Sequence, residues 1–265
     1  MLLNKYEIIS KISNGEFGEV LKVTHNNKFY AVKYGAKELI KYELSIYKQL
    51  KSCGNISSIY DVFEYNNNMY MVLDLYTMTL VDYKLRTYNN ENYFERCIVI
   101  IKSLIIIIKT IHENNIVHRD LKPTNICLDS NNKLYIIDFG IAKIYKHTNV
   151  HNSESKIKGL IGSVNFSSLN VINLIEPSRR DDVEALFYNL LYLLLSNEHY
   201  KYYDGLNTLE KKNITSIIYL MQNTLNIQNI DYILLNRLFT YIRRLKYNQE
   251  PKYDYIVQLL SKLVI

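Results

Sequence analysis

The residues best suited to chemistry lie in one short stretch, His118–Asn125, and in the Asp-Phe-Gly tripeptide that begins at Asp138. Asp120 and Asn125 stand five positions apart on a segment without helical or strand periodicity, and Asp138 follows a short apolar run. A carboxylate that can act as a base, an amide and a second carboxylate that can bind metal ions are the groups that phosphoryl transfer needs. The spacing therefore predicts a phosphoryl-transfer site.

These two motifs resemble those of the eukaryotic-type protein kinases, whose Ser/Thr-specific members carry His-Arg-Asp-x-Lys-x-x-Asn in the catalytic loop. The resemblance implies that Asp120 accepts or orients the proton of the substrate hydroxyl and that Lys122 neutralises charge on the transferred phosphate. It also implies that Asn125 and Asp138 hold Mg²⁺, which prefers hard oxygen ligands. These four residues are the expected catalytic residues, and ATP and Mg²⁺ are the expected cofactors.

The segment Tyr6–Tyr34 alternates apolar and polar residues and predicts strands joined by tight turns. Inside it, Ile12–Val20 resembles the kinase Gly-rich loop, a hairpin whose backbone N–H groups cover the nucleotide phosphates. Ser13 occupies the position where the family has the first glycine of this loop. Alone, the segment is equally typical of an ordinary hairpin. The Tyr-Ala-Val-Lys strand that follows it and ends at Lys33 is what favours the Gly-rich loop. The residues of this loop that we expect to contact nucleotide are Ile12, Ser13, Gly15, Gly18 and Val20.

Lys33 matches the family lysine that contacts the α- and β-phosphates of the nucleotide. A helix is predicted over Ala36–Leu50, and Glu43 within it fits the glutamate that pairs with this lysine. The connection from Lys33 to Glu43 is short for the family, so Glu38 is left as an alternative partner.

Two further strands are predicted over Asn55–Tyr65 and Met69–Leu75. The resemblance places a gatekeeper at Leu73 and the hinge immediately after it. The carbonyl of Asp74 and the N–H of Tyr76 would then hold the edge of the adenine. Because these contacts use the backbone, a plain core strand is equally compatible with the sequence.

Helical patterns dominate the rest of the chain. The expected helices are Tyr93–His112, Asp182–Leu195, Leu209–Thr224, Ile230–Tyr247 and Tyr253–Leu263. The resemblance covers Tyr6 to about Leu260 and implies an α+β, bilobal protein-kinase fold. A single kinase domain, residues 1–265, would contain a small, mostly β N-lobe with one helix (about 1–77), a larger, mostly α C-lobe (about 78–265), and ATP in the cleft between them.

Two later motifs narrow the family. The polar segment His147–Lys158, expected to be a solvated activation loop, is not followed by the usual Ala-Pro-Glu. Instead, Gly162–Asn170 resembles Gly-Thr-Ala-x-Tyr-x-Ser-Ile-Asn of the casein kinase 1 family, with Ser163 keeping the hydroxyl expected to touch Asp120 and Lys122. The missing tripeptide suggests that activation-loop phosphorylation is not needed.

The second motif, Ser178–Glu184, resembles Ser-Arg-Arg-Asp-Asp-Leu-Glu of the same family. The related vaccinia-related kinases carry a similar motif, usually with Gly at the position that Asp181 occupies here. Asp182 maps to the aspartate that holds the catalytic-loop backbone. Arg179 and Arg180 have two interpretations of equal weight: they bind phosphate on a substrate, which guanidinium matches bidentately, or they pair with local carboxylates.

Composition excludes several other classes. The formal charge of +6 is mild; it favours acidic or phosphorylated partners and is too small to predict nucleic-acid binding. Cys53, Cys97 and Cys127 show no zinc or disulfide spacing. The apolar run Cys97–Ile111 is too short to span a bilayer and carries lysines. We expect a soluble, intracellular monomer, in cytoplasm or nucleus, with no membrane partner.

The predicted function is transfer of the γ-phosphoryl group of Mg-ATP to Ser or Thr of proteins, with a preference for acidic or pre-phosphorylated sites. Three alternatives stay open. A catalytically weak or dead kinase-fold scaffold is favoured only by Ser13 and the short connection to Glu43. A vaccinia-related-type kinase would act on chromatin or DNA-binding proteins, and Asp181 argues mildly against it. A small-molecule kinase is disfavoured by Lys122 together with Ser163.

Overall fold

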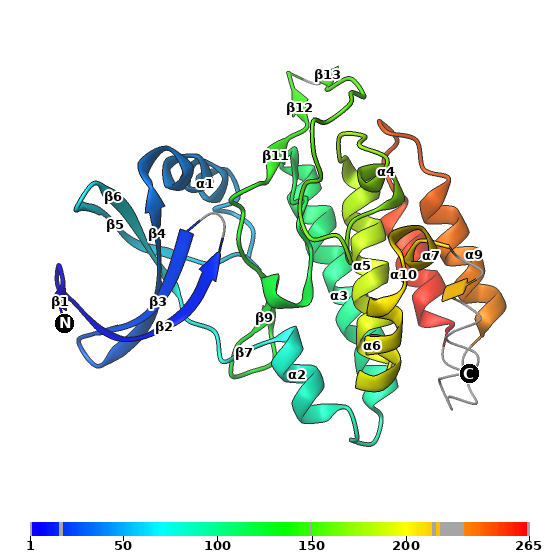
Figure 1. Cartoon of the computed structure of the whole chain (residues 1–265), viewed down its shortest axis with the longest axis horizontal. Helices are drawn as coiled ribbons and strands as arrows, with labels where there is room; N and C mark the ends of the chain where they lie inside the picture. Colours follow the sequence, from blue (N-terminus) through cyan, green and yellow to red (C-terminus); the bar gives the residue numbers. More distant parts are fainter. Residues whose placement is uncertain (1, 16–17, 149, 214–215, 218–230, 264–265) are drawn as a thin grey trace. The chain divides into compact units, whose positions relative to one another are not determined.

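The computed structural model describes residues 2–15, 18–148, 150–213, 216–217 and 231–263. These residues form two compact units (Figure 1). The first unit comprises Met1–Thr79 and Cys127–Ala142, and the second comprises Leu80–Ile126 and Lys143–Ile265. The segment that carries the Asp-Phe-Gly motif therefore groups with the N-terminal part of the chain. The division between lobes near residue 77 stays a prediction.

The first unit is built on a six-stranded antiparallel sheet with the order β1-β2-β3-β4-β6-β5. Its strands are β1 (Leu2–Leu3), β2 (Tyr6–Gly15), β3 (Gly18–His25), β4 (Lys28–Ala36), β5 (Ile59–Tyr65) and β6 (Asn68–Asp74). Asparagine pairs with positive φ close two of the hairpins: Asn26 and Asn27 between β3 and β4, and Asn66 and Asn67 between β5 and β6. Asparagine tolerates this backbone conformation, which two-residue hairpin turns require. The predicted strand from Asn55 begins four residues later, at Ile59.

One helix and three short strands complete this unit. Helix α1 (Lys37–Gln49) packs on β6, and its buried residues Ile40, Glu43, Ile46 and Tyr47 recur at the spacing of one helical face. Strands β7 (Met78–Thr79), β9 (Ile126–Leu128) and β10 (Leu134–Ile136) form a second sheet in the order β10-β9-β7. An apolar core cluster of this unit lies on the large sheet and consists of Leu3, Tyr6, Val23, Val32, Tyr70 and Val72.

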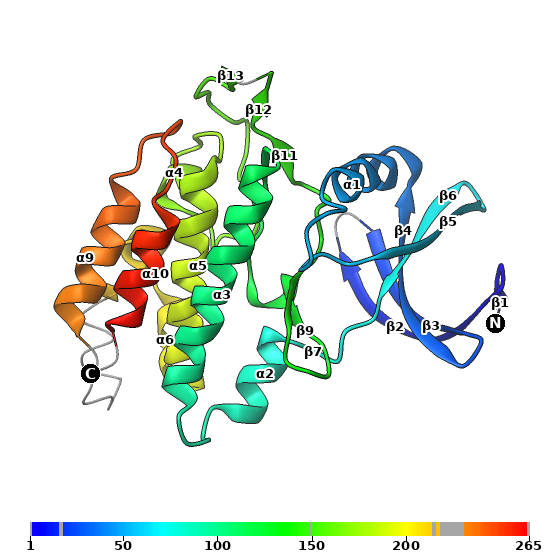
Figure 2. The ribbon, with the colours of Figure 1, turned by 180° about the vertical axis from the view of Figure 1, so that it is seen from behind.

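The second unit is helical. Its helices are α2 (Leu80–Thr87), α3 (Tyr93–Glu113), α4 (Leu169–Ile172), α5 (Arg179–Leu194), α6 (Asn197–Gly205), α7 (Thr208–Lys211), α9 (Tyr232–Arg243) and α10 (Tyr253–Ser261), with one 3-10 turn, η1 (Pro123–Asn125). Helix α5 packs against both α3 and α9, and α10 packs against the same two helices (Figure 2). Nearly every residue of α5 is buried. The apolar part of the helix predicts this, but the charged residues of its first turn are buried as well.

Several predicted helix boundaries were wrong. Helix α5 begins at Arg179, three residues before the predicted start, because the Asp181 carboxylate accepts the Ser178 N–H at 2.7 Å and so caps an earlier first turn. Helix α9 ends at Arg243, before the predicted end at Tyr247. The predicted helix Leu209–Thr224 lies mostly outside the described residues. Those that are described in this region include α7 and the helical residues 216 and 217.

The predicted solvated activation loop is partly structured. Just before it, strand β11 (Lys143–Ile144) pairs with β8 (Ile116–Val117). At its start, β12 (Lys146–His147) pairs with β13 (Val150–His151). His151 is half-buried, with its ring 5.1 Å from the rings of Tyr145 and Tyr247. This histidine is therefore a packing residue rather than part of a solvated loop.

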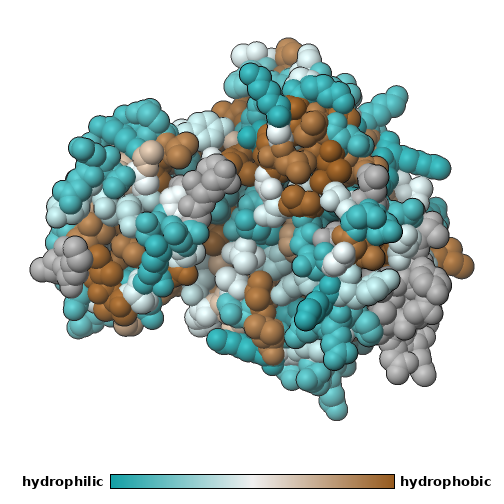
Figure 3. All heavy atoms as spheres, viewed as in Figure 1, coloured by the Kyte–Doolittle hydropathy of each residue, from teal (hydrophilic) through white to brown (hydrophobic). Residues whose placement is uncertain are grey.

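The sheet-rich first unit and the helical second unit confirm the α+β class. On the face seen in Figure 3, hydrophilic side chains cover most of both units, and apolar residues gather over the upper part of the helical one. Among the helices of the described residues, none has the length and apolar character needed to cross a membrane.

Candidate active site

The catalytic-loop residues of the second unit are held in one hydrogen-bond network. Asp120 is 9% exposed. The Asn125 amide nitrogen donates to the Asp120 carbonyl at 3.0 Å and to its carboxylate at 3.2 Å. The Lys122 ammonium lies 2.7 Å from the same carboxylate oxygen, Oδ2. The three predicted residues of this loop are thus brought together within hydrogen-bond distance.

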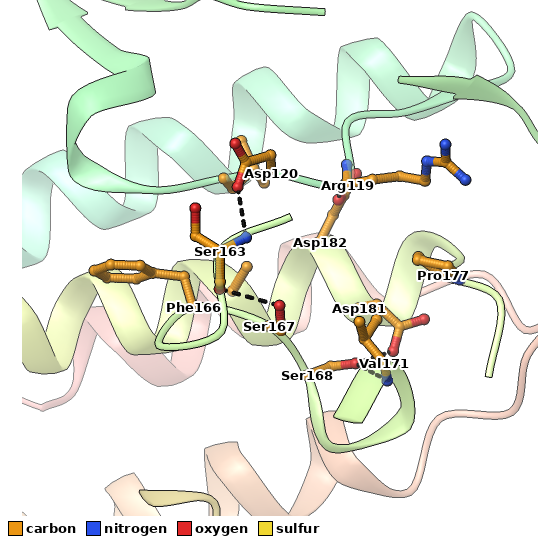
Figure 4. Close-up of a pocket in the computed structure, with 12 residues that line it drawn as sticks. Arg119, Asp120, Ser163, Phe166, Ser167, Ser168, Val171, Pro177, Asp181 and Asp182 are labelled. Atoms are coloured by element: carbon orange, nitrogen blue, oxygen red, sulfur yellow. Dashed lines mark hydrogen bonds between the residues drawn. The ribbon is translucent and has the colours of Figure 1, made fainter. Parts of the chain in front are cut away.

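Ser163 joins this network through two different atoms. Its backbone N–H donates to Asp120 Oδ1 at 2.9 Å (Figure 4), and its hydroxyl accepts from Lys122 Nζ at 3.0 Å. The preceding residue, Gly162, has φ +76°, and a Cβ there would lie 2.5 Å from the Arg119 carbonyl oxygen. Only glycine lets this segment approach the catalytic loop so closely. Sequence reasoning named Ser163 but missed the requirement at Gly162.

Asp182, at the start of α5, holds the backbone of the catalytic loop. Its carboxylate accepts the His118 N–H at 2.7 Å and the Arg119 N–H at 2.9 Å. It also lies 3.0 Å from His112 Nε2, and His112 Nδ1 lies 2.6 Å from the Tyr253 hydroxyl. Burial would raise the pKa of Asp182, but the hydrogen bonds from His112 and the loop hold that pKa below its usual value. Sequence reasoning found Asp182 and missed His112, which lies in the last turn of α3, before the catalytic-loop motif, and was assigned only to a predicted helix.

Arg119 has a carboxylate partner of its own. Its Nη1 lies 2.7 Å from Glu176 Oε1, and Lys143 Nζ lies 3.2 Å from the same oxygen. The Arg119 and Glu176 side chains are 15% and 10% exposed. Arg119 also has a positive φ of 71°, an uncommon conformation for a residue with a side chain, so its backbone needs support from its neighbours.

The first unit brings together the predicted lysine, glutamate and metal-binding aspartate. Lys33 Nζ lies 2.7 Å from Glu43 Oε2 and 2.7 Å from Asp138 Oδ1. Glu43 also accepts the Phe139 N–H at 3.1 Å. The alternative partner, Glu38, is 86% exposed and pairs with Lys41 instead. Burial would lower the pKa of Lys33, but the two carboxylates hold it above its usual value, so the side chain is a cation.

The Gly-rich segment forms the hairpin of β2 and β3. Ser13 pairs with Val20 and Gly15 pairs with Gly18. Gly18 has φ +137°, and a Cβ there would lie 2.5 Å from the Tyr34 carbonyl oxygen. This position therefore requires glycine. Residues 16 and 17 of the motif lie outside the described residues.

The side chains at the predicted hinge are tied into the first unit. The Asp74 carboxylate accepts the Ser58 N–H at 2.8 Å and the Tyr60 hydroxyl at 2.7 Å. The Tyr76 hydroxyl lies 2.9 Å from that of Ser57. The contacts predicted with adenine are made by the backbone, and they stay a prediction.

Arg179 and Arg180 are each 9% exposed and already bound. Arg179 donates to the Asn248 carbonyl at 2.9 Å, and its guanidinium lies 4.8 Å from the ring centre of Tyr145. Arg180 lies 2.7 Å from Glu154 Oε1. These contacts match the second of the two interpretations, in which the arginines fix local structure.

The described residues contain no group of three or more His, Cys, Asp or Glu side chains that could hold a metal ion by itself. Mg²⁺ commonly binds through one or two protein oxygens together with waters and substrate phosphates. Asp138, whose side chain is 35% exposed, can supply one such oxygen.

Comparison with known proteins identifies the family of this chain. The family model described as protein kinase domain matches residues 6–263. A probable casein kinase I homolog of Encephalitozoon cuniculi is 30% identical, over 97% of this chain and 84% of the relative. Casein kinase I homologs 2 and 3 of Schizosaccharomyces pombe are 28% and 27% identical, over 98% of this chain but only 62% of each relative. The chain belongs to the protein kinase family and is a Ser/Thr protein kinase of the casein kinase I type.

Proposed function

We propose that this chain transfers the γ-phosphoryl group of Mg-ATP to Ser and Thr side chains of proteins, inside the cell and as a monomer. The observation that carries the proposal is the set of contacts on Asp120. Its two carboxylate oxygens receive Lys122, Asn125 and the Ser163 N–H, all within 3.2 Å. A carboxylate fixed in this way is oriented to accept a hydroxyl proton.

The roles in the second unit follow from these contacts. Asp120 orients the substrate hydroxyl and accepts its proton as the oxygen attacks. Lys122 keeps its side chain 29% exposed, so its cation can face negative charge on the transferred phosphoryl group. Ser163 holds Lys122 by its hydroxyl and Asp120 by its N–H, so one residue sets the positions of both.

The roles in the first unit concern the nucleotide. Lys33, held by Glu43, is proposed to contact the α- and β-phosphates. The β2–β3 hairpin covers the phosphates, and the backbone of Asp74 and Tyr76 holds the adenine. Asp138 and Asn125 would hold Mg²⁺, which when bound offsets the negative charge of the phosphates.

The acidic or pre-phosphorylated preference rests on the charge of +6 and on the casein kinase I relationship. Arg179 and Arg180 are buried in local contacts, so we assign them a structural role. Acidic substrate residues would then be attracted by exposed lysines and by the overall charge.

The test is phosphate transfer from labelled ATP with magnesium by the wild type, Asp138→Asn and Asp120→Asn. The acceptors are casein, a peptide with a phosphoserine near the acceptor, and its unphosphorylated twin. We expect each variant to lose at least about 100-fold in rate. Faster transfer to the phosphorylated peptide would support the preference, and equal rates would refute it. Wild-type transfer no greater than that of the variants would favour the scaffold alternative.

A further inference from the structure

A large groove lies on the first unit. None of the expected catalytic residues lines it, but Asp74 and Tyr76, whose backbone is proposed to hold the adenine, do. Its volume is about 930 Å³. It is lined by the second half of α1, the connection from α1 to β5, the beginning of β5, the residues after β6, and the β9–β10 turn with part of β10. This volume is near the upper end of the usual range for binding pockets, about 300–1,000 Å³.

The groove contains apolar side chains that the fold leaves only half-buried. They come from α1, β5 and the residue that follows β6: Leu44, Ile59, Val62 and Leu75. The rings of Tyr76 and Tyr135, 4.5 Å apart, also line it. Covering these side chains would remove apolar surface from water, which favours binding by about 25 cal/mol per Å².

Three exposed lysines line the same groove: Lys48, Lys51 and Lys133. Within the described part of the chain, none of them lies within 4.0 Å of a carboxylate oxygen. Lys48 and Lys51 suit the C-terminal end of α1, where the helix dipole favours cations. That reason does not apply to Lys133, which lies in the β9–β10 turn.

The two carboxylates of the groove are already engaged. Asp74 accepts from the Ser58 N–H and the Tyr60 hydroxyl. Asp129 accepts the backbone N–H groups of Asn131 and Lys133 at 2.8 and 2.9 Å, and these bonds lower its pKa. The groove therefore holds three lysines against two carboxylates, so its cationic groups exceed its anionic ones by one, beside its apolar side chains.

We propose that this groove binds an acidic, amphipathic segment of a protein partner. Apolar side chains of the segment cover Leu44, Ile59, Val62 and Leu75, and its carboxylates face the three lysines. An apolar centre with charged groups on exposed side chains around it is the usual arrangement of a protein–protein interface. The charges favour an acidic partner and oppose a basic one.

The experiment selects binders from a displayed library of random 12-residue peptides on the immobilised full chain. Enriched peptides are then measured by fluorescence polarisation against three proteins. These are the wild type, the triple variant Lys48→Glu/Lys51→Glu/Lys133→Glu, and a matched control, Lys22→Glu/Lys28→Glu/Lys41→Glu. The control reverses the same number of charges on the same unit but outside the groove. Melting temperature and Mg-ATP affinity report folding of each protein independently of peptide binding.

We expect enriched peptides that combine Asp or Glu with large apolar residues. The groove variant should bind them at least about tenfold more weakly than the wild type, while the control stays within about twofold, because attraction becomes repulsion at three positions only in the former. Equal loss in both triple variants would mean that only net charge matters and would overturn the proposal. So would displacement of the peptides by Mg-ATP, enrichment of basic peptides, or no enrichment.

Discussion

The pair formed by Arg119 and Glu176 makes the sharpest test of how the catalytic loop is held. Replacing Glu176 by Gln keeps its shape and removes its charge, leaving the Arg119 cation largely buried. Removing one partner of a buried pair costs about 3–5 kcal/mol. Because the two side chains keep 15% and 10% exposure, we expect the lower end of this range, about 3 kcal/mol. Lys143 is 40% exposed and adds little to the pair.

The assay is a double-mutant cycle with Glu176→Gln, Arg119→Met and their combination, measured by urea unfolding and by kcat on casein. We expect a coupling energy of at least about 1.5 kcal/mol. We also expect kcat of Glu176→Gln to fall at least about tenfold, because Arg119 precedes Asp120 and is held in an uncommon backbone conformation. The exposed pair of Lys37 and Glu64 is the matched control, and Glu64→Gln should change stability by less than about 0.5 kcal/mol.

Two results would refute this reasoning. A coupling energy no larger than that of the control pair, with kcat unchanged, would show that Glu176 does not support the loop. We also predict that Glu176 pairs with Arg119 in place of a phosphate on the activation segment, so that activity does not need this phosphorylation. Loss of wild-type activity after phosphatase treatment would contradict that prediction.

Further predictions concern the same unit. Ser163→Ala should lower kcat about fivefold to tenfold, because it removes the hydroxyl that holds Lys122. Ser163→Thr retains a hydroxyl and should retain the wild-type kcat; steady-state kinetics of both variants tests this. Gly162→Ala should lower the free energy of unfolding by at least about 1 kcal/mol in urea, because of its positive φ and the clash with a carbonyl. Burial lowers the pKa of Lys84 to about 8, while the unfolded chain keeps this lysine protonated to about pH 10. The unfolded state therefore binds more protons between these values, so wild-type stability should rise with pH relative to Lys84→Met; a constant difference in urea unfolding across this window would contradict the assignment.

The sequence by itself determined the residues whose roles depend on near neighbours in the chain. The stretch from Asp120 to Asn125 is short, so the types and spacing of its residues already imply the chemistry that they can share. Local turn chemistry likewise accounts for the hairpins closed by asparagine pairs. Whole-chain motifs were also sufficient for the α+β class and the kinase family, which the family comparison confirms.

Only the tertiary structure decided which distant groups meet. Glu38 and Glu43 lie on the same helix, and their distances from Lys33 depend on how α1 packs against the sheet. The contacts of Arg119 with Glu176, and of His112 with Asp182, join segments more than fifty residues apart. No local pattern encodes such pairings, because they arise where separate elements bury their apolar faces together and bring the polar groups on their edges within reach.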